Sequence, residues 1–375
     1  MKISVCVAIY NIDETYLRAC LDTVTADKSP DIEIILGDDC SDNGAEKICR
    51  EYAAADSRIR YLRPSSNGGV SRLRNMMTAA ARGDYIAFID GDDAVADDFV
   101  KNLIRSADFG CDIVMYEWRH FAKAVPPTDP TAADVIPVDR AACRIFSRSC
   151  ITGAPPQIER FGISNCTPSS VCTKLYRRAF LLENGISFNS GLKKSQDVAF
   201  NTEAFFYCRS LGYLPKAMYF YRANPTSICH RYSADFESIA AACIRSDLDS
   251  MKKFFPNDAD CAAQWGKYKV IFYIISNFEL NIFHRGNPKS TAERRADFLR
   301  FIASPLYVEF FEKFDFSAYH WHERRLILRL AKMRSFALLN LLYRHPLLLK
   351  IYGWGKNKLT SLCIGSAVYI LFWHA

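Results

Sequence analysis

Carboxylates at the end of a predicted strand are the residues best able to do chemistry in this chain. The sequence DGDD at residues 90–93 directly follows the apolar, β-branched run at 86–89. Alternate carboxylates can reach one ion together, and Mg²⁺ or Mn²⁺ prefers oxygen ligands that can include phosphates. We therefore predict that Asp90 and Asp92 hold a divalent cation against a diphosphate. The alternative is an acidic turn that opens a helix near Ala96.

An acidic segment after an earlier apolar run could recognise a nucleotide. Asp39 lies in IILGDDCSD, where a carboxylate at a strand end can accept a hydrogen bond from a nucleobase or a ribose hydroxyl. The alternative is a turn that caps a helix from Ala45. We assign the ligand contact to Asp39 and the helix cap to Asp42.

Tyr10 and Arg74 are two further candidates for nucleotide contacts. Tyr10 closes the first apolar run, where stacking of its ring on a base would contribute about 1–3 kcal/mol. It could equally be a core residue. Arg74 follows Asn67-Gly68-Gly69 and could pair with a phosphate or a base carbonyl. Its alternative is a solvated helix face beside Arg72.

Alternating strand and helix patterns specify the elements that must position these side chains. Strands are expected at residues 3–9, 32–36, 59–62 and 85–89, with helices at 16–24, 45–54 and 71–81. This order predicts an α/β fold with a Rossmann-like, mostly parallel sheet flanked by helices. Ligands of such sheets lie beyond the carboxyl ends of the strands, so we expect the polar strand ends to converge on one rim.

The rest of the chain changes character twice. Residues 126–137 form a proline-rich, weakly structured insertion, and 151–170 are typical of a loop. From about Asp235 the pattern becomes helical and rich in aromatic residues. We therefore predict a nucleotide-binding and catalytic domain at 1–234 and a helical C-terminal region at 235–375.

Composition excludes several classes of protein. Half of the 375 residues are hydrophobic and 24% are charged, as in globular proteins and unlike disordered chains. The 14 cysteines are scattered without a CxxC pair, and the N-terminal apolar run is too short for a signal peptide. We expect a reducing, cytoplasmic setting. The net charge of +7 is mild, and we expect no nucleic-acid partner.

Basic residues dominate the C-terminal end, where Glu323 alone opposes nine Lys and Arg side chains between 324 and 358. Residues 326–350 mix these cations with Leu, Ile and Phe, which suits an anionic membrane surface. The apolar run at 359–373 is near the short limit for spanning a bilayer. The alternative is that these helices pack on each other or on the catalytic domain.

The strand-end motifs together resemble the family 2 glycosyltransferases of the GT-A fold, particularly bacterial enzymes that assemble surface polysaccharide. The similarity covers residues 1–105 and 170–230, with the motifs VAIYN, IILGDDCSD, NGGVSRLRN and FIDGDD. The resemblance implies that Tyr10 and Asp39 hold the nucleobase and that Arg74 aids base or phosphate binding. It also implies that Asp90 and Asp92 are the DxD pair, with Asp92 closer to the metal.

A later segment, CTKLYRRAFLLENGISFNSGLKKSQDVAFN, is similar to the family's acceptor-side segment. Asp197 corresponds there to the catalytic base, which would take the acceptor hydroxyl's proton during an inverting transfer. The alternative is that Asp197 is the N-cap of a helix at 198–207. Tyr221, Arg222 and Ser227 resemble the family's YR…S stretch, a lid near the diphosphate, although Arg222 could equally be a surface arginine.

Two residues depart from the family pattern. Ala8 stands where many relatives have proline, which loosens the backbone beside the base. Gln196 stands where many have glutamate, so one carboxylate remains of an acidic pair on the acceptor side.

The resemblance implies a metal-dependent, inverting glycosyltransferase with Mn²⁺ or Mg²⁺ as cofactor. An aspartate that accepts from a base N–H suits uracil, so we expect a UDP-sugar donor and a saccharide or lipid-linked acceptor. The expected location is cytoplasmic, with peripheral attachment to the inner face of the membrane left open. The alternatives are a non-catalytic nucleotide-sugar-binding homologue and a Rossmann-type oxidoreductase, although no GxGxxG follows the first strand.

Overall fold

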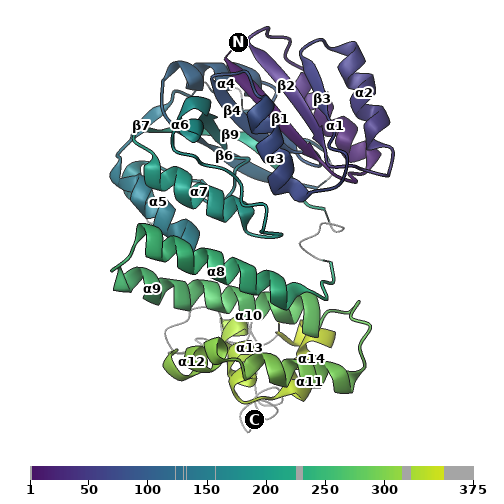
Figure 1. Ribbon diagram of the computed structural model, residues 1–375, viewed down its shortest axis with the longest axis vertical. Helices are drawn as coiled ribbons and strands as arrows, with labels where there is room; N and C mark the ends of the chain where they lie inside the picture. Colours follow the sequence, from purple (N-terminus) through teal and green to yellow (C-terminus); the bar gives the residue numbers. More distant parts are fainter. Residues whose placement is uncertain are drawn as a thin grey trace, which may run out of the picture. The chain divides into compact units, whose positions relative to one another are not determined.

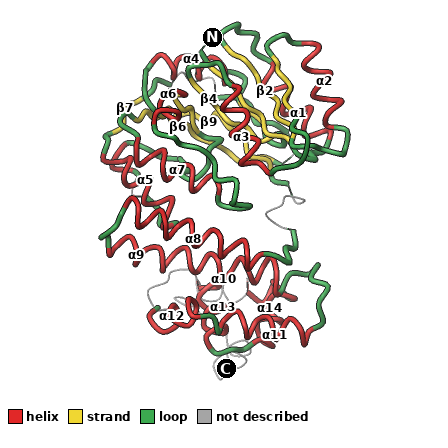
Figure 2. The backbone as a smooth tube through the Cα atoms, viewed as in Figure 1, coloured by secondary structure: helices red, strands yellow, loops and turns green. Residues whose placement is uncertain are grey.

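A computed structural model describes residues 2–122, 124–129, 131, 133–156, 158–224, 231–314 and 322–349. The chain divides into two compact units (Figures 1 and 2). The first contains residues 1–225 and 241–262, and the second contains 226–240 and 263–375. The expected division into a domain at 1–234 and a helical region at 235–375 stays a prediction.

The first unit is built on one mixed sheet, drawn in yellow in Figure 2. Among the described residues, the strand order is β3-β2-β1-β4-β8-β6-β9-β5, and β7 pairs with β9. Strands β1, β2, β3 and β4 are mutually parallel, whereas β8 runs antiparallel to β4 and β6. The strands are β1 Ile3–Ile9, β2 Ile32–Asp38, β3 Ile59–Leu62, β4 Tyr85–Asp90, β5 Ala94–Val95, β6 Ile113–Phe121, β7 Ile136–Val138, β8 Lys174–Arg177 and β9 Leu211–Arg222.

Helices flank this sheet, as Figure 1 shows. They are α1 Glu14–Thr25, α2 Ala45–Ala55, α3 Gly69–Ala80, α4 Phe99–Asp108, α5 Ala141–Thr152, α6 Arg178–Glu183 and α7 Gln196–Tyr207. Strands β1 and β2 are buried along their whole length, which explains their uninterrupted apolar sequences. Helix α1 begins where the Asp13 carboxylate accepts the Thr15 N–H at 2.9 Å.

The α/β fold expected from the sequence is confirmed, and the first four strands and three helices lie where the pattern placed them. Two details differ. The chain after DGDD forms the short strand β5 before α4 begins at Phe99, so DGDD does not open a helix at Ala96. The proline-rich insertion ends in β7, and the expected loop at 151–170 contains the end of α5 and a 3₁₀ turn, Glu159–Phe161.

The second unit is helical in its described residues. It contains α10 Ile271–Asn277 between π-helical turns at Gly266–Val270 and Phe278–Ile282, then α11 Thr291–Ile302, α12 Pro305–Lys313, α13 His322–Lys332 and α14 Phe336–Arg344. Helices α8 Phe236–Phe254 and α9 Ala259–Trp265 have residues in both units. Aromatic side chains fill the core of the second unit, where Phe283 stacks on Tyr343 with ring centroids 5.0 Å apart.

Membrane spans were sought within the described part of the chain, and no helix there is long and apolar enough to cross a bilayer. The apolar run at 359–373, which the sequence places near the limit for a span, lies outside the described residues.

Candidate active site

The ends of three adjacent parallel strands build the rim on which the sequence placed the site. The Gly91 N–H, just after β4, donates to the Ala8 carbonyl at 2.9 Å, and the Asp39 N–H, just after β2, donates to the Ile9 carbonyl at 2.9 Å. The ends of β4 and β2 thus flank the end of β1. A side chain at position 91 would place its Cβ 3.1 Å from the Ala8 oxygen, so glycine suits this close approach.

Arg74 joins two candidate carboxylates that are far apart in the sequence. Its side chain reaches inward from α3, and the residue is 3% exposed. One guanidinium nitrogen, Nη2, lies 2.7 Å from Asp90 Oδ1, and Nη1 lies 2.5 Å from Asp197 Oδ1. The interpretation of Arg74 as part of a solvated helix face is therefore wrong. Asp90 and Asp197 thus each bind a different terminal nitrogen of the same guanidinium group.

Asp197 lies in the first turn of α7, which begins at Gln196 after Ser195 in the left-handed conformation. Asp197 is thus not the N-cap, and its carboxylate instead faces Arg74 and accepts the Val171 N–H at 3.3 Å. Burial raises the pKa of Asp197, the positive charge of Arg74 lowers it, and the charge of Asp90 adds to the rise. A carboxylate whose pKa is raised in this way is a stronger proton acceptor when ionised.

The carboxylates of the DGDD turn crowd one another. Burial and the nearby charge of Asp90 raise the pKa of Asp92, whose Oδ2 accepts a hydrogen bond from Asn224 Nδ2 at 3.3 Å. Asp93 is 1% exposed and accepts hydrogen bonds from the Tyr219 hydroxyl and the Arg222 N–H. Burial, Asp90 and Asp92 together raise the pKa of Asp93 to about 8. Like charges gathered in this way favour a bound cation.

The donor set fits a hard divalent cation because Asp90 and Asp92 offer only oxygen atoms. In the described parts of the chain, no three or more His, Cys, Asp or Glu side chains group into a metal-binding cluster. A cation at this turn would therefore take further oxygen ligands from water or from a diphosphate.

Asp39, the predicted nucleobase ligand, has a role inside the protein. Its buried carboxylate accepts the N–H groups of Gly68 at 2.9 Å and Gly69 at 2.7 Å. These are the first donors of α3, the helix that carries Arg74, so Asp39 fixes the start of that helix. The structure leaves the ligand role of Asp39 as a prediction.

The predicted cap of α2 is wrong. The N-cap is Gly44, in the left-handed region at a φ of 89°, and the Asn43 side chain accepts the Ala45 N–H at 3.4 Å. The Asp42 N–H instead donates to the Asn11 side chain at 2.9 Å.

Tyr10 is 51% exposed at the end of β1. The alternative that it belongs to the core is therefore wrong, and its ring is open to a stacking partner.

Arg222, which the resemblance places near the diphosphate, lies against the DGDD turn. It is 5% exposed, its Nε donates to the Asp92 carbonyl at 2.6 Å, and its guanidinium lies 4.5 and 4.4 Å from the Tyr16 and Phe121 ring centroids. It is thus not an ordinary surface arginine, and its role at the diphosphate stays a prediction. Tyr219 was missed, because nothing in a tyrosine within an apolar strand signals a bond to a distant carboxylate. Ser227, the last residue of the predicted lid stretch, lies outside the described residues.

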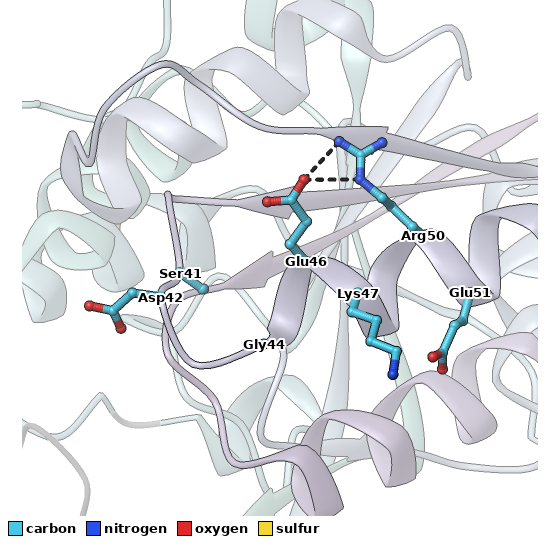
Figure 3. A pocket seen from close by; sticks show the side chains of 7 residues that line it. All are labelled: Ser41, Asp42, Gly44, Glu46, Lys47, Arg50 and Glu51. Carbon is cyan, nitrogen blue, oxygen red and sulfur yellow. Dashed lines mark hydrogen bonds and ion pairs between the residues drawn. The ribbon is translucent and has the colours of Figure 1, made fainter.

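A separate hollow lies beside the start of α2 (Figure 3). It is open, with a volume of about 720 Å³, and Arg50 there hydrogen-bonds Glu46 at 2.9 and 2.8 Å. None of the predicted ligand-binding or catalytic residues lines it, so it is not the candidate site. Its lining residues are Ser41, Asp42, Gly44, Glu46, Lys47, Arg50 and Glu51.

Solved structures of known proteins share this fold. The chain resembles Staphylococcus aureus TarS 1–349 in complex with UDP, with a TM-score of 0.56 and 20% identity over 92% of each chain. It also resembles the mannosyltransferase PcManGT from Pyrobaculum calidifontis in complex with GDP-Man and Mn²⁺, with a TM-score of 0.50 and 13% identity over 91% of this chain and 87% of that one. The fold is GT-A, with a helical C-terminal region.

Sequence comparison agrees with the fold. The putative glycosyltransferase EpsH of Bacillus subtilis is 30% identical over 243 residues, which are 63% of this chain and 65% of EpsH. The uncharacterized glycosyltransferase EpsJ of Bacillus subtilis is 30% identical over 242 residues, or 60% of this chain and 62% of EpsJ. The match thus spans a little less than two thirds of these relatives. Residues 4–144 match the model of glycosyl transferase family 2, so the N-terminal part of the chain resembles that family.

Proposed function

We propose that this protein transfers a sugar from a nucleotide-sugar, in particular a UDP-sugar, to a saccharide or lipid-linked acceptor during surface polysaccharide biosynthesis. The transfer is inverting and needs Mn²⁺ or Mg²⁺. The observation that carries the proposal is the bridge made by Arg74, which holds a carboxylate of the DGDD turn and Asp197 on one guanidinium. A leaving-group site and a general base must be close together for a single displacement.

The donor is held at the rim by residues of three strand ends. The exposed ring of Tyr10 stacks on the nucleobase, and Asp39 contacts the base beside it. Asp90 and Asp92 ligate the cation, which when bound neutralises the charge that grows on the diphosphate as the sugar bond breaks. Burial, and after it the charges of the neighbouring carboxylates, raise the pKa values of Asp92 and Asp93, and a bound cation would relieve this repulsion.

Asp197 acts as the general base on the acceptor side. The acceptor hydroxyl oxygen attacks the anomeric carbon while its proton passes to Asp197, and the bond between that carbon and the diphosphate oxygen breaks, so the nucleoside diphosphate leaves with the electron pair. Arg74 keeps Asp197 ionised before the reaction and orients its carboxylate. Such base catalysis contributes roughly 10²–10⁴-fold to the rate.

The decisive experiment follows release of the nucleoside diphosphate from a panel of UDP- and GDP-sugars, with Mn²⁺, Mg²⁺ or excess chelator. We expect turnover of a UDP-sugar that requires metal. Asp197→Asn should abolish transfer while donor binding survives. A protein that binds the donor but never turns it over would instead be a non-catalytic homologue. Gln196, which stands where many relatives have glutamate, would then be evidence for that alternative.

Membrane attachment is a separate part of the proposal. In the second unit, Arg329 and Arg334 are exposed, and Met333, which is adjacent to Arg334 in the chain, is 53% exposed. Cations beside exposed apolar side chains suit the anionic inner face of the cytoplasmic membrane. The protein should float with phosphatidylglycerol vesicles at low salt and be released at high salt, because salt screens the attraction. Equal flotation with neutral vesicles would contradict this mode of attachment.

A further inference from the structure

Strands β6 and β9 continue past Asp90, and the end of β9 lies beside the rest of the DGDD turn, where the Arg222 N–H donates to Asp93 at 2.8 Å. Tyr176 of β8 pairs with Ile86 of β4 and with Ile113 of β6, so those two residues lie at the same level of the sheet. Strands β4 and β6 run in the same direction, because both are antiparallel to β8. Asp90 is four residues after Ile86 and Glu117 is four residues after Ile113, so Asp90 and Glu117 also lie at the same level. The last four residues of β6 therefore extend about 13 Å beyond Asp90, at about 3.3 Å per residue. Strand β9 pairs with β6 to its end.

This projection carries three aromatic side chains, which we call the aromatic face: Trp118, His120 and Tyr221. The centroids of the Trp118 and His120 rings are 4.6 Å apart, and those of His120 and Tyr221 are 5.3 Å apart. Trp118 and Tyr221 lie 6.3 Å apart, and all three pairs meet edge to face. His120 is exposed, Tyr221 is 38% exposed and Trp118 is half-buried. The set thus offers ring surface to solvent at the rim of the sheet.

The aromatic face continues directly from the candidate site. Tyr219 and Tyr221 are two residues apart in β9, so their side chains lie on the same face of the strand. The Tyr219 hydroxyl hydrogen-bonds Asp93, in the DGDD turn. Tyr221 lies beside the same turn, because the next residue, Arg222, donates its N–H to Asp93 at 2.8 Å. A ligand that extends outward from the reaction centre along β9 would meet these rings.

We propose that the aromatic face binds a saccharide unit of the acceptor, next to the unit that receives the new sugar. This inference rests on the proposed function. The faces of aromatic rings are electronegative, so they attract the weakly positive C–H groups on one side of a pyranose. The imidazole nitrogens of His120 and the Tyr221 hydroxyl offer hydrogen bonds to sugar hydroxyls at the same place. An aromatic surface with a few polar groups is typical of sites that recognise small polar ligands.

Two roles other than saccharide binding would give different experimental results when the rings are removed. Aromatic cross-strand pairs stabilise a sheet without any ligand, in which case their loss would lower stability alone. A nucleobase could also stack on these rings, in which case their loss would weaken nucleotide binding. A saccharide site predicts a third outcome, the loss of oligosaccharide binding with donor binding unchanged.

The test compares Trp118→Leu with Phe109→Leu. Leucine keeps apolar bulk in the strand but removes the ring, and Phe109 is an aromatic residue of the same unit, 45% exposed at the end of α4 and outside the aromatic face. Chitotetraose, cellotetraose and mannotetraose serve as probes in saturation-transfer NMR and in titrations. UDP affinity and UDP-sugar hydrolysis with Mn²⁺ are measured on the same samples, with melting temperature as the check on folding.

We expect the wild type and Phe109→Leu to bind at least one tetrasaccharide and Trp118→Leu to bind it roughly 3- to 10-fold more weakly, with UDP affinity unchanged. Equal binding by Trp118→Leu, or no binding of any tetrasaccharide to the folded wild type, would overturn the inference. So would an equal loss of UDP affinity. Trp118-dependent saccharide binding without any donor turnover by the wild type would support the aromatic face and would refute the proposed function instead.

Discussion

Replacing Arg74 by methionine removes the cation that joins Asp90 to Asp197 while keeping a long apolar side chain in α3. Breaking a fully buried ion pair costs about 3–5 kcal/mol because a charge is left without a partner. Here the Asp90 and Asp197 side chains are 40% and 29% exposed, so water screens part of that cost. We expect a loss of about 2 kcal/mol in the free energy of unfolding, or roughly 4–8 °C in melting temperature.

The larger effect should fall on the reaction. Arg74 lowers the pKa of Asp197 against the opposing effects of burial and of Asp90. Without Arg74 that pKa rises, so more of the base is protonated at a given pH and the acidic limb of the kcat profile moves to higher pH. We also expect kcat at neutral pH to fall by about 10²-fold or more, because the base loses both its charge and its orientation.

The assay is the pH dependence of kcat for UDP-sugar transfer, with thermal unfolding of the same samples. Arg72→Met is the matched control, since Arg72 is exposed on the same helix two residues away, and it should leave the profile unchanged. An Arg74→Met profile that keeps its acidic limb where the wild type has it would refute the coupling of Arg74 to the base. Equal losses in both variants would show that the effect belongs to the helix and not to the guanidinium.

Three further substitutions test separate parts of the site. Asp92→Asn should abolish metal-dependent turnover. It should not lower the melting temperature, because burial and the neighbouring carboxylates already disfavour the charge that it removes. A marked loss of stability would show that the charge of Asp92 stabilises the fold. Lys174→Met should leave the Thr167 and Ser170 carbonyls without their Lys174 hydrogen bonds, so amide hydrogen exchange in that loop should rise and kcat should fall. Lys216→Met, a control at another buried lysine on β9, should change neither. Tyr10→Ala should weaken UDP binding about 5- to 150-fold by calorimetry without changing stability, and unaltered UDP affinity would remove the stacking role.

The sequence predicts the first half of the sheet well because parallel strands buried on both faces are continuous apolar runs. Ile3–Ile9 and Ile32–Asp38 are buried throughout, and the first has the predicted bounds. The polar residues after these strands mark the rim. The mixed half of the sheet is harder to predict, since the order of β8, β6 and β9 depends on pairings between distant segments. Local patterns carry no information about such pairings.

For the candidate site, too, the sequence identifies single residues but not the contacts between distant segments. Sequence patterns identify Asp90, Asp197 and Arg74 singly, but 123 residues separate Arg74 from Asp197, and their contact depends on how α3 and α7 pack. The cap assigned to Asp42 fails because Gly44 adopts a left-handed conformation that allows the turn to close without that carboxylate. The burial of Arg222 depends on two aromatic rings from other segments, which no spacing within its own strand reveals.

A cation held jointly by the DGDD carboxylates and the diphosphate of the donor is central to the proposed function. The most direct measurement is the affinity of UDP for the wild type and for Asp92→Asn, by calorimetry, with saturating Mn²⁺ and with excess chelator. We predict that Mn²⁺ tightens UDP binding to the wild type at least tenfold and does not tighten it for the variant. Equal UDP affinity for the wild type with Mn²⁺ and with chelator would contradict the central claim.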